Sequence, residues 1–394
     1  MEIRNKHVPD IYLNISHFVD HFIMLIFAKA AYDAGIEFGL GYEEIIIFGL
    51  LGFILFGAMA PIAAILADKF SRSTLMVIFH FGVGISAILC SLSNTPLQLA
   101  IGLGLVGAFS SIYHPVGIAM LLKNSKNLGF RLGINGVFGN LGVAAAPLVT
   151  GYLLLLSNWR LSFTIPGLLC LLFGLIFIFA LRAETQPKND KKSDEKKLPF
   201  APRWQRALFA LALTTTSGGF IFGSITFIIP RYFEIELSNV SNSVAITGLL
   251  ASLVYAVAGF AQLGAGWLID RFSEKLILFV VGLGQIIFIF LASIATDFQL
   301  FFVTLIATSF VFGQIPLVDT IMSRYIPDHA RGKILCIKFV LNLIVGAAVI
   351  PISSLLLKAG YELSTLFSFM SALAIFVVLA SIILPSREHI KLRK

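Results

Sequence analysis

The stretch LADKFSR occupies residues 66–72 after a run of apolar residues, and a closely similar stretch, LIDRFSE, occupies residues 268–274 after another apolar run. The two copies lie about half a chain length apart. Nearly the same offset relates Gly142 to Gly346. Internal repetition at this scale is typical of secondary transporters, whose two halves are duplicated around a central pathway. The repeat predicts two similar halves.

The composition excludes a soluble globular protein. Of the 394 residues, 58% are hydrophobic and only 13% are charged, whereas ordinary soluble domains carry about 25% charged residues. The apolar residues fall in stretches of roughly 20, the length that crosses a bilayer as a helix. Lys and Arg total 29 against 21 Asp and Glu. In a chain of this kind the basic excess is a topology signal, so no nucleic-acid partner is predicted.

Hydropathy together with Gly, Pro and charge punctuation predicts an all-α integral membrane protein with twelve transmembrane helices in two pseudo-symmetric six-helix bundles. The predicted spans are 9–34, 42–66, 73–93, 96–122, 129–156, 160–182, 204–230, 242–269, 275–295, 298–325, 332–357 and 361–384.

A polar segment divides the chain. Residues 183–203 are charged and contain prolines, which is linker composition. We therefore expect an N-terminal bundle over 1–182, a cytoplasmic linker over 183–203 and a C-terminal bundle over 204–394.

The basic residues predict the orientation. With the N-terminus in the cytoplasm, only Arg160, Arg231 and Lys358 lie outside, while Lys29 and Lys338 lie within spans. All other Lys and Arg residues then lie on the cytoplasmic side, as the positive-inside rule requires. Both termini are therefore expected in the cytoplasm. The short loops and tails predict a bacterial cytoplasmic (inner) membrane.

The first predicted helix carries a polar face. His17, Asp20 and His21 stand at positions i, i+3 and i+4, which lie on one side of a helix. Ionisable groups inside a membrane span are costly and are candidates for function. A carboxylate beside imidazoles suits proton binding and release, a static hydrogen-bonded cluster, or ligation of a divalent metal. Proton or substrate coupling is the favoured interpretation, and a metal site on His17, Asp20 and His21 is the least favoured.

Three further residues inside spans are candidates for the same role. His114 precedes Pro115, which removes a backbone hydrogen bond and can kink the fourth helix. The repeat offset brings His114 close to Asp319 of the tenth helix. Asp319 and Lys338 lie at similar distances from the loop between helices ten and eleven, so we expect them at equal depth, where they can form a buried ion pair. Such a pair is either structural, which is slightly favoured, or a switch that is broken during the transport cycle.

Two other groups have simpler interpretations. Lys29 and Asp33, at i and i+4, predict a local salt bridge whose lysine extends to the membrane interface. His80 has no titratable neighbour in the sequence and is interpreted as a core histidine.

The repeated loops, the expected six-plus-six helices and the charged central segment resemble the Major Facilitator Superfamily over the whole chain. The resemblance implies a latch for alternating access at Asp68, Lys69, Arg72, Asp270 and Arg271. Independently of the family, a carboxylate at a helix end can accept hydrogen bonds from helix N-termini and from Arg side chains of neighbouring helices.

A narrower resemblance is to the fosmidomycin-resistance-like drug efflux branch, through SHFVDH at 16–21 and FSSIYHPVGIA at 109–119. Members of that branch more often carry Asn then Asp where this chain has Asp20 then His21. The glycines at 133, 136, 139 and 142 are similar to the Gly-rich fifth helix of drug/proton antiporters. A face of small residues that lets two helices pack closely explains them equally well.

Together these features predict a secondary active transporter working by alternating access, and the narrower resemblance implies proton-coupled export of small organic or drug-like molecules. The alternative is proton-coupled uptake of an anionic or metal-chelating compound such as a siderophore, or of a divalent metal. The sequence contains no GxxxxGK[ST], HExxH or GxSxG motif, so an ATPase or enzyme is not predicted. The expected partners are a small-molecule substrate, protons and the lipid bilayer; the chain is expected to be a monomer without a cofactor.

Overall fold

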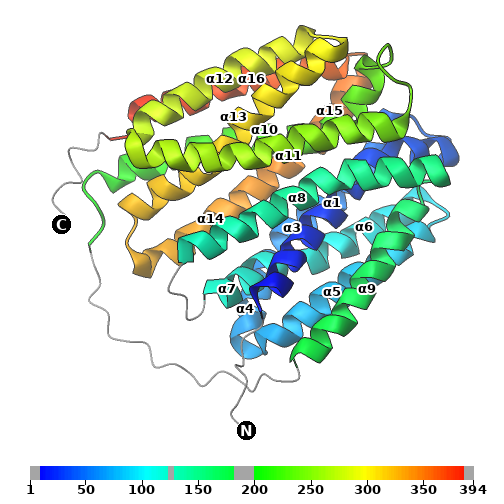
Figure 1. Cartoon of the computed structure of the whole chain (residues 1–394), viewed down its shortest axis with the longest axis horizontal. Coiled ribbons are helices and arrows are strands. Elements are labelled where there is room, and N and C mark those ends of the chain that lie inside the picture. Colours follow the sequence, from blue (N-terminus) through cyan, green and yellow to red (C-terminus); the bar gives the residue numbers. More distant parts are fainter. Residues whose placement is uncertain (1–8, 123–127, 182–198, 386–394) are drawn as a thin grey trace. The chain divides into compact units, whose positions relative to one another are not determined.

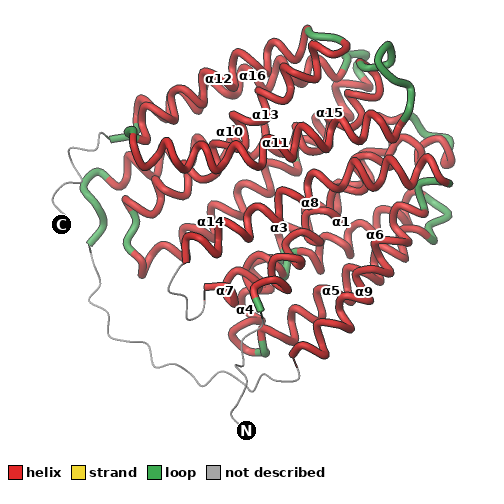
Figure 2. Tube along the Cα trace, in the orientation of Figure 1, coloured by secondary structure: helices red, strands yellow, loops and turns green. Residues whose placement is uncertain are grey.

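The computed structural model describes residues 9–122, 128–181 and 199–385. Within these ranges every regular element is a helix (Figure 2). The chain forms two compact units, Met1–Asp194 and Glu195–Lys394. The predicted linker over 183–203 begins outside the described residues, which resume at residue 199.

The first unit contains the segments predicted as the first six spans (Figure 1). Its elements in chain order are α1 (Asp10–Phe38), α2 (Tyr42–Ile45), the 3₁₀ turn η1 (Ile46–Gly49), α3 (Leu50–Ala58), α4 (Ala60–Lys69), α5 (Arg72–Ser91), α6 (Pro96–Ser110), the π-helical turn η2 (Tyr113–Gly117), α7 (Ile118–Leu122), α8 (Leu128–Leu156) and α9 (Leu161–Leu181).

The second unit is likewise helical throughout its described part. Its elements are α10 (Trp204–Glu236), α11 (Val244–Arg271), α12 (Glu274–Ile294), α13 (Asp297–Tyr325), α14 (Asp328–Ala347), α15 (Val349–Lys358) and α16 (Leu363–Ile383).

The number of membrane spans agrees with the prediction. In the described part, eleven helices are long and apolar enough to cross a membrane, and the bent pair Tyr42–Ala58 and Ala60–Lys69 brings the total to as many as twelve. Some helix ends differ from the predicted spans by several residues. Helix α1 continues beyond residue 34 to Phe38, where Gly39 adopts the left-handed conformation (φ 69°) that commonly ends a helix.

Helix α10 was predicted to end at Pro230 but continues to Glu236. A proline inside a helix removes one backbone hydrogen bond but does not by itself prevent the next turns from forming. Tyr232 and Phe233 are buried beyond it, and the Tyr232 ring stacks on Phe367 of α16 at 4.5 Å between centroids. Tertiary packing therefore extends this helix.

Within the first unit, α1 packs along α8, and glycine makes the approach possible. A Cβ atom at Gly142 would lie 2.3 Å from the carbonyl oxygen of Phe18, and one at Gly139 would lie 2.7 Å from the His17 ring. In contrast, a Cβ at Gly133 or Gly136 would meet nothing within 4 Å. Two of the four regularly spaced glycines therefore serve close helix packing.

The second unit uses the same device at the positions related by the repeat. Helices α10 and α14 meet where a Cβ atom at Gly223 would lie 2.9 Å from the Cα atom of Gly346. Gly346 is the counterpart of Gly142. The internal repeat therefore preserves a close helix crossing in each unit.

We expect Gly142→Ala to destabilise the protein and Gly136→Ala to leave it unchanged or slightly more stable. The new methyl group at 142 meets a backbone oxygen, which cannot move aside cheaply, so the cost should be about 1–3 kcal/mol. At 136 the methyl enters open space, and alanine favours the helix by up to about 1 kcal/mol. Thermal unfolding of the purified variants in detergent measures both, and equal melting temperatures would contradict the packing argument.

Candidate functional site

The polar face of α1 lies against α8 and η2. His17 and Asp20 are buried, and His21 is half-buried. The Nε2 atoms of His17 and His21 lie 3.1 Å apart, within hydrogen-bond distance. The i, i+4 spacing seen in the sequence therefore does bring these two imidazoles into contact.

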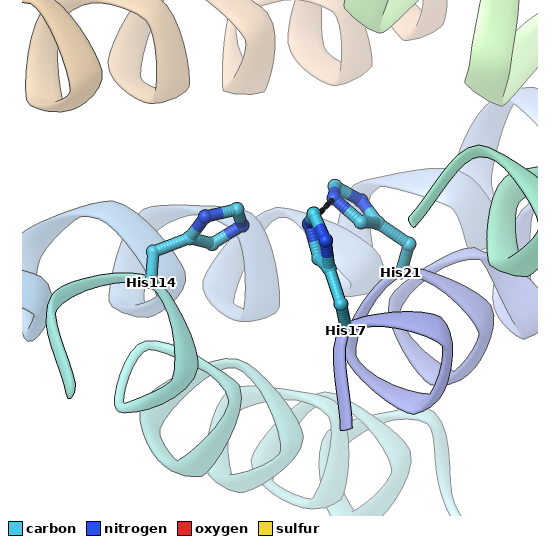
Figure 3. A group of neighbouring side chains, drawn as sticks. All are labelled: His17, His21 and His114. Carbon is cyan, nitrogen blue, oxygen red and sulfur yellow. Dashed lines mark hydrogen bonds between the residues drawn. The ribbon is translucent and has the colours of Figure 1, made fainter. Parts of the chain in front are cut away.

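His114 joins the α1 residues from a different element. It lies in η2, where the fourth span changes from α6 into a π-helical turn that contains Pro115, and such turns occur frequently at functional sites. Its ring centroid lies 5.3 Å from that of His17 and 5.5 Å from that of His21. Figure 3 shows the His114 side chain extending toward the two α1 histidines.

His17 is held by its other ring nitrogen. Its Nδ1 lies 2.7 Å from the backbone carbonyl oxygen of Asn135 in α8. Because a carbonyl can only accept, Nδ1 carries the proton and Nε2 presents a lone pair toward His21. The ring also stacks on Tyr113 at 4.8 Å between centroids. His17 is thus fixed in position and in tautomer.

Sequence reasoning missed a buried network that supports this site. The Asn135 amide donates to Asn14 Oδ1 at 2.9 Å and to the Tyr113 hydroxyl at 2.8 Å. Tyr113 in turn donates to the carbonyl of Leu13 at 3.0 Å. The signal in the sequence was the i, i+3 spacing of Asn14 from His17, because it places both on one helix face.

The carboxylate of Asp20 is fully buried. Its Oδ2 lies 3.3 Å from Nε2 of His114, and neither of its oxygens has a hydrogen bond within the described residues. A buried charge is expensive unless it is paired. The attraction between Asp20 and His114 therefore depends strongly on the protonation state of both side chains.

His80 is a core residue, in agreement with its interpretation from the sequence. It is fully buried in α5, and its Nε2 lies 2.9 Å from the hydroxyl of Ser16. The rings of Phe79 and Phe173 pack against it.

In the second unit, Asp319 of α13 and Lys338 of α14 form an ion pair. The equal depth predicted from their positions around the loop is consistent with this contact. The expectation of burial is wrong, because the Asp319 side chain is 52% exposed and that of Lys338 is 23% exposed within the structure. The two side chains meet at the surface of their unit.

Lys29 was expected to extend toward the membrane interface, and that expectation is wrong. Its side chain is buried in α1, with 2% exposure. The helix continues beyond it to Phe38, so Lys29 lies well inside the element rather than near its end. This placement could not be recognised once the helix was predicted to end at residue 34.

The first loop candidate lies between α4 and α5. Asp68 and Lys69 are exposed at the end of α4, and Asp68 makes no hydrogen bond or ion pair to another described residue. Arg72, at the start of α5, donates to the carbonyl of Ala119 in α7 at 3.4 Å. The expected arginine partner of Asp68 is therefore not seen here, and Arg72 makes the contact between elements.

The second loop candidate, between α11 and α12, differs from expectation in the same way. Asp270 is exposed, and Arg271 lies over the Trp267 ring of its own helix at 3.8 Å. The carboxylate that contacts a neighbouring helix is Glu274 at the start of α12, which pairs with Arg324 of α13. An acidic residue in the first turn of a helix was the available signal, since that position favours negative charge.

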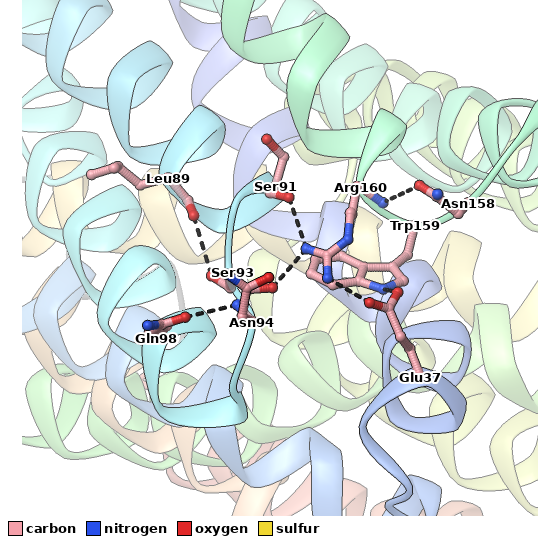
Figure 4. Close-up of polar contacts among 9 residues, drawn as sticks. All are labelled: Glu37, Leu89, Ser91, Ser93, Asn94, Gln98, Asn158, Trp159 and Arg160. Atoms are coloured by element: carbon pink, nitrogen blue, oxygen red, sulfur yellow. Dashed lines mark hydrogen bonds and ion pairs between the residues drawn. The ribbon is translucent and has the colours of Figure 1, made fainter.

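Near the C-terminal end of α1, a polar cluster joins three segments of the first unit (Figure 4). Arg160 donates to Glu37 at 2.5 Å and to the carbonyl oxygens of Ser91 and Ser93 at 2.9 and 2.6 Å. The Trp159 indole donates to the other oxygen of Glu37 at 2.7 Å. This cluster anchors the end of α1 to the α5–α6 and α8–α9 connections.

These features define a multi-pass α-helical membrane protein with two helical units and ionisable side chains buried inside its spans. The model of the Major Facilitator Superfamily matches residues 13–246 and 237–394. The chain therefore belongs to the Major Facilitator Superfamily and is a transporter, not an enzyme, which confirms the class that the sequence predicted.

The curated relatives include proteins named for drug resistance. The chain is 24% identical to the multidrug resistance protein MdtG of Proteus mirabilis (strain HI4320) over 332 residues, which cover 83% of this chain and 82% of the relative. It is 26% identical to MdtG of Escherichia coli (strain K12 / DH10B) over 286 residues, 71% of this chain and 70% of the relative.

Solved structures share the fold. A bacterial homolog of the human lysosomal transporter Spinster, in an inward-facing and occupied conformation, matches with a TM-score of 0.74 and 18% identity over 95% of each chain. The nucleoside transporter NupG matches with a TM-score of 0.72 and 13% identity over 95% of this chain and 98% of its own. At these identities the likeness concerns the fold alone.

We expect Asn135→Leu to destabilise the protein by about 1–3 kcal/mol, because Asn14 and Tyr113 would lose their buried partner. The bond from His17 goes to the backbone of residue 135 and should survive. Asn140→Leu is the matched control, since Asn140 lies on the same helix and its side chain makes no hydrogen bond within the described residues. The measurement is thermal unfolding of both variants, and the supporting role of the network is refuted if they melt alike.

Proposed function

We propose that this transporter exports small organic or drug-like molecules across the cytoplasmic membrane in exchange for protons, by alternating access. The curated relatives support the substrate class, because two of them are named as multidrug resistance proteins. They do not favour the alternative of uptake of an anionic or metal-chelating compound or of a divalent metal.

The observation that carries the proton coupling is the buried carboxylate of Asp20 beside His114. The two groups belong to different elements, α1 and η2, and lie 3.3 Å apart. An ionised Asp20 attracts a protonated His114 strongly where water is excluded, whereas a proton on the carboxylate removes that attraction. Proton binding thereby changes the energy with which α1 and η2 hold together.

The local structure allows such a change to become a movement. Pro115 follows His114 in the π-helical turn, where the regular backbone hydrogen bonding of the fourth span is interrupted. Helix α1, in contrast, is held firmly by Gly139, Gly142 and Asn135 of α8. We therefore assign the moving part to the η2 side and the fixed part to α1 and α8.

In this scheme His17 and His21 complete the coupling site. His17 is oriented by the Asn135 carbonyl, and its Nε2 accepts a hydrogen bond from Nε2 of His21. A proton can then be exchanged among the three imidazoles and Asp20 over short distances. The site takes up a proton from the side of higher proton concentration, and the substrate is released in that same half of the transport cycle. This coupling requires the proton to bind the two conformations of the transporter with different affinities.

Asp20→Asn should abolish export driven by a pH gradient, because the amide keeps the shape of the carboxyl group and cannot release a proton. The measurement is flux in proteoliposomes with an imposed pH gradient, using a panel that includes the cation ethidium and the phosphonate fosmidomycin, with the internal pH monitored. Exchange of substrate without a gradient should persist in the variant and shows that it is folded.

His80→Gln is the matched control, since His80 is a buried histidine of the same unit outside the site, and it should transport like the unmodified protein. Full gradient-driven export by Asp20→Asn would remove Asp20 from the mechanism. Flux of a tested compound that moves no protons would remove proton coupling itself.

We further propose that the Asp319–Lys338 pair contributes to the cycle rather than to stability. Because both side chains are partly exposed within their unit, Asp319→Asn leaves no fully buried lysine without its partner, so it should change the melting temperature little while reducing transport. The exchange of charges, Asp319→Lys with Lys338→Asp, should restore part of the activity. The proposal fails if Asp319→Asn and Lys338→Met both transport normally.

A further inference from the structure

The three histidines of the site converge in a way that proton exchange alone does not require. One ring nitrogen from each of His17, His21 and His114 lies within 4.8 Å of those from the other two. His17 is buried, and the other two are half-buried, so the cluster is shielded yet retains some exposed surface within its unit. Figure 3 shows the rings directed toward a common region.

The spacing suits a small tetrahedral ion. Zn²⁺ binds imidazole nitrogen at about 2.0–2.1 Å, and tetrahedral geometry then separates two ligand nitrogens by about 3.3–3.4 Å. The Nε2 atoms of His17 and His21 already lie 3.1 Å apart. An ion between them therefore needs only small movements of these rings, together with an approach of His114 from η2.

The surroundings supply what such a ligand set needs. Metal-binding histidines commonly donate their second ring N–H to a carbonyl or carboxylate, which directs the other nitrogen at the ion. His17 does so toward the carbonyl of Asn135 at 2.7 Å, so its lone pair faces the cluster. Nε2 of His17 is therefore already oriented to bind a dication.

Asp20 supplies the matching charge. Its carboxylate is fully buried, has no hydrogen bond within the described residues, and lies 3.3 Å from Nε2 of His114. A bound dication would compensate this charge, and the carboxylate can either serve as the fourth ligand or orient His114. Imidazole and carboxylate together favour zinc and neighbouring first-row metals over Mg²⁺ and Ca²⁺, which prefer oxygen ligands alone.

We propose that His17, His21 and His114 form a binding site for a first-row transition-metal dication, represented by Zn²⁺, with Asp20 as its charge partner. This goes beyond the proposed function, because the ion is a ligand that bridges α1 and η2 and is not the transported molecule. A bridged pair of elements is also held in one arrangement, so the metal stabilises the protein.

The test uses the full chain in lipid nanodiscs, in metal-free buffer and without a polyhistidine tag, which would itself bind zinc. Zn²⁺ binding is measured by competition with a chromophoric chelator, and stability by thermal unfolding with and without Zn²⁺. We expect one ion per chain and a zinc-dependent rise in melting temperature. The variants His17→Ala, His21→Ala and His114→Ala should each bind at least about tenfold more weakly, and Mg²⁺ should not compete.

One further variant and one metal substitution separate loss of a ligand from loss of structure. His80→Ala removes a buried histidine outside the cluster and should bind like the unmodified protein. Co²⁺ in place of Zn²⁺ should show the visible absorption of a tetrahedral site in the unmodified protein.

The inference is overturned if the unmodified protein binds no more zinc than His17→Ala, or if His80→Ala weakens binding as much as the cluster variants. None of these readouts depends on transport. Failure of metal binding therefore leaves drug export standing, and failure of drug export leaves the metal site standing.

Discussion

The close contact between α1 and α8 is the constraint on which the rest of the N-terminal unit depends. It exists because two glycines of α8 leave room for the backbone of α1 at Phe18 and for the ring of His17. Only at this separation can His17 reach the Asn135 carbonyl, and only then does its free nitrogen point toward His21. The geometry of the histidine site therefore depends on the close packing that the small residues of α8 allow.

The polar groups of this unit are distributed according to the cost of burial. Asn14, Tyr113 and Asn135 satisfy one another, so they stabilise the contact of three spans without leaving a donor or acceptor unpaired. The oxygens of Asp20, in contrast, lack hydrogen bonds in the described structure, as do a few other buried polar atoms of this unit, such as the Ser110 hydroxyl. At a buried carboxylate of this kind, the binding of a proton or of another cation changes the energy of the contact between α1 and η2.

Much of this could be predicted from residue patterns alone. The all-helical fold and the spans follow from hydropathy, because a bilayer offers backbone groups no hydrogen-bond partners and leaves the helix as the structure for apolar runs of this length. The proximity of His17 and His21 follows from helical spacing. The pairing of Asp319 with Lys338 could be predicted, because both residues lie at similar distances from the short connection between α13 and α14. Their exposure could not be predicted.

The sequence by itself determined the class of protein, the number of spans and the residues on the polar face of α1, since these depend on composition and on periodicity along one chain. Tertiary structure alone decided that His114 meets that face, that Asn135 orients His17, that Lys29 is buried, and that Glu274 rather than Asp270 contacts a neighbouring helix. Each of these depends on the rotation and separation of two helices. Those quantities are set by side-chain packing between segments far apart in the chain, which no local pattern encodes.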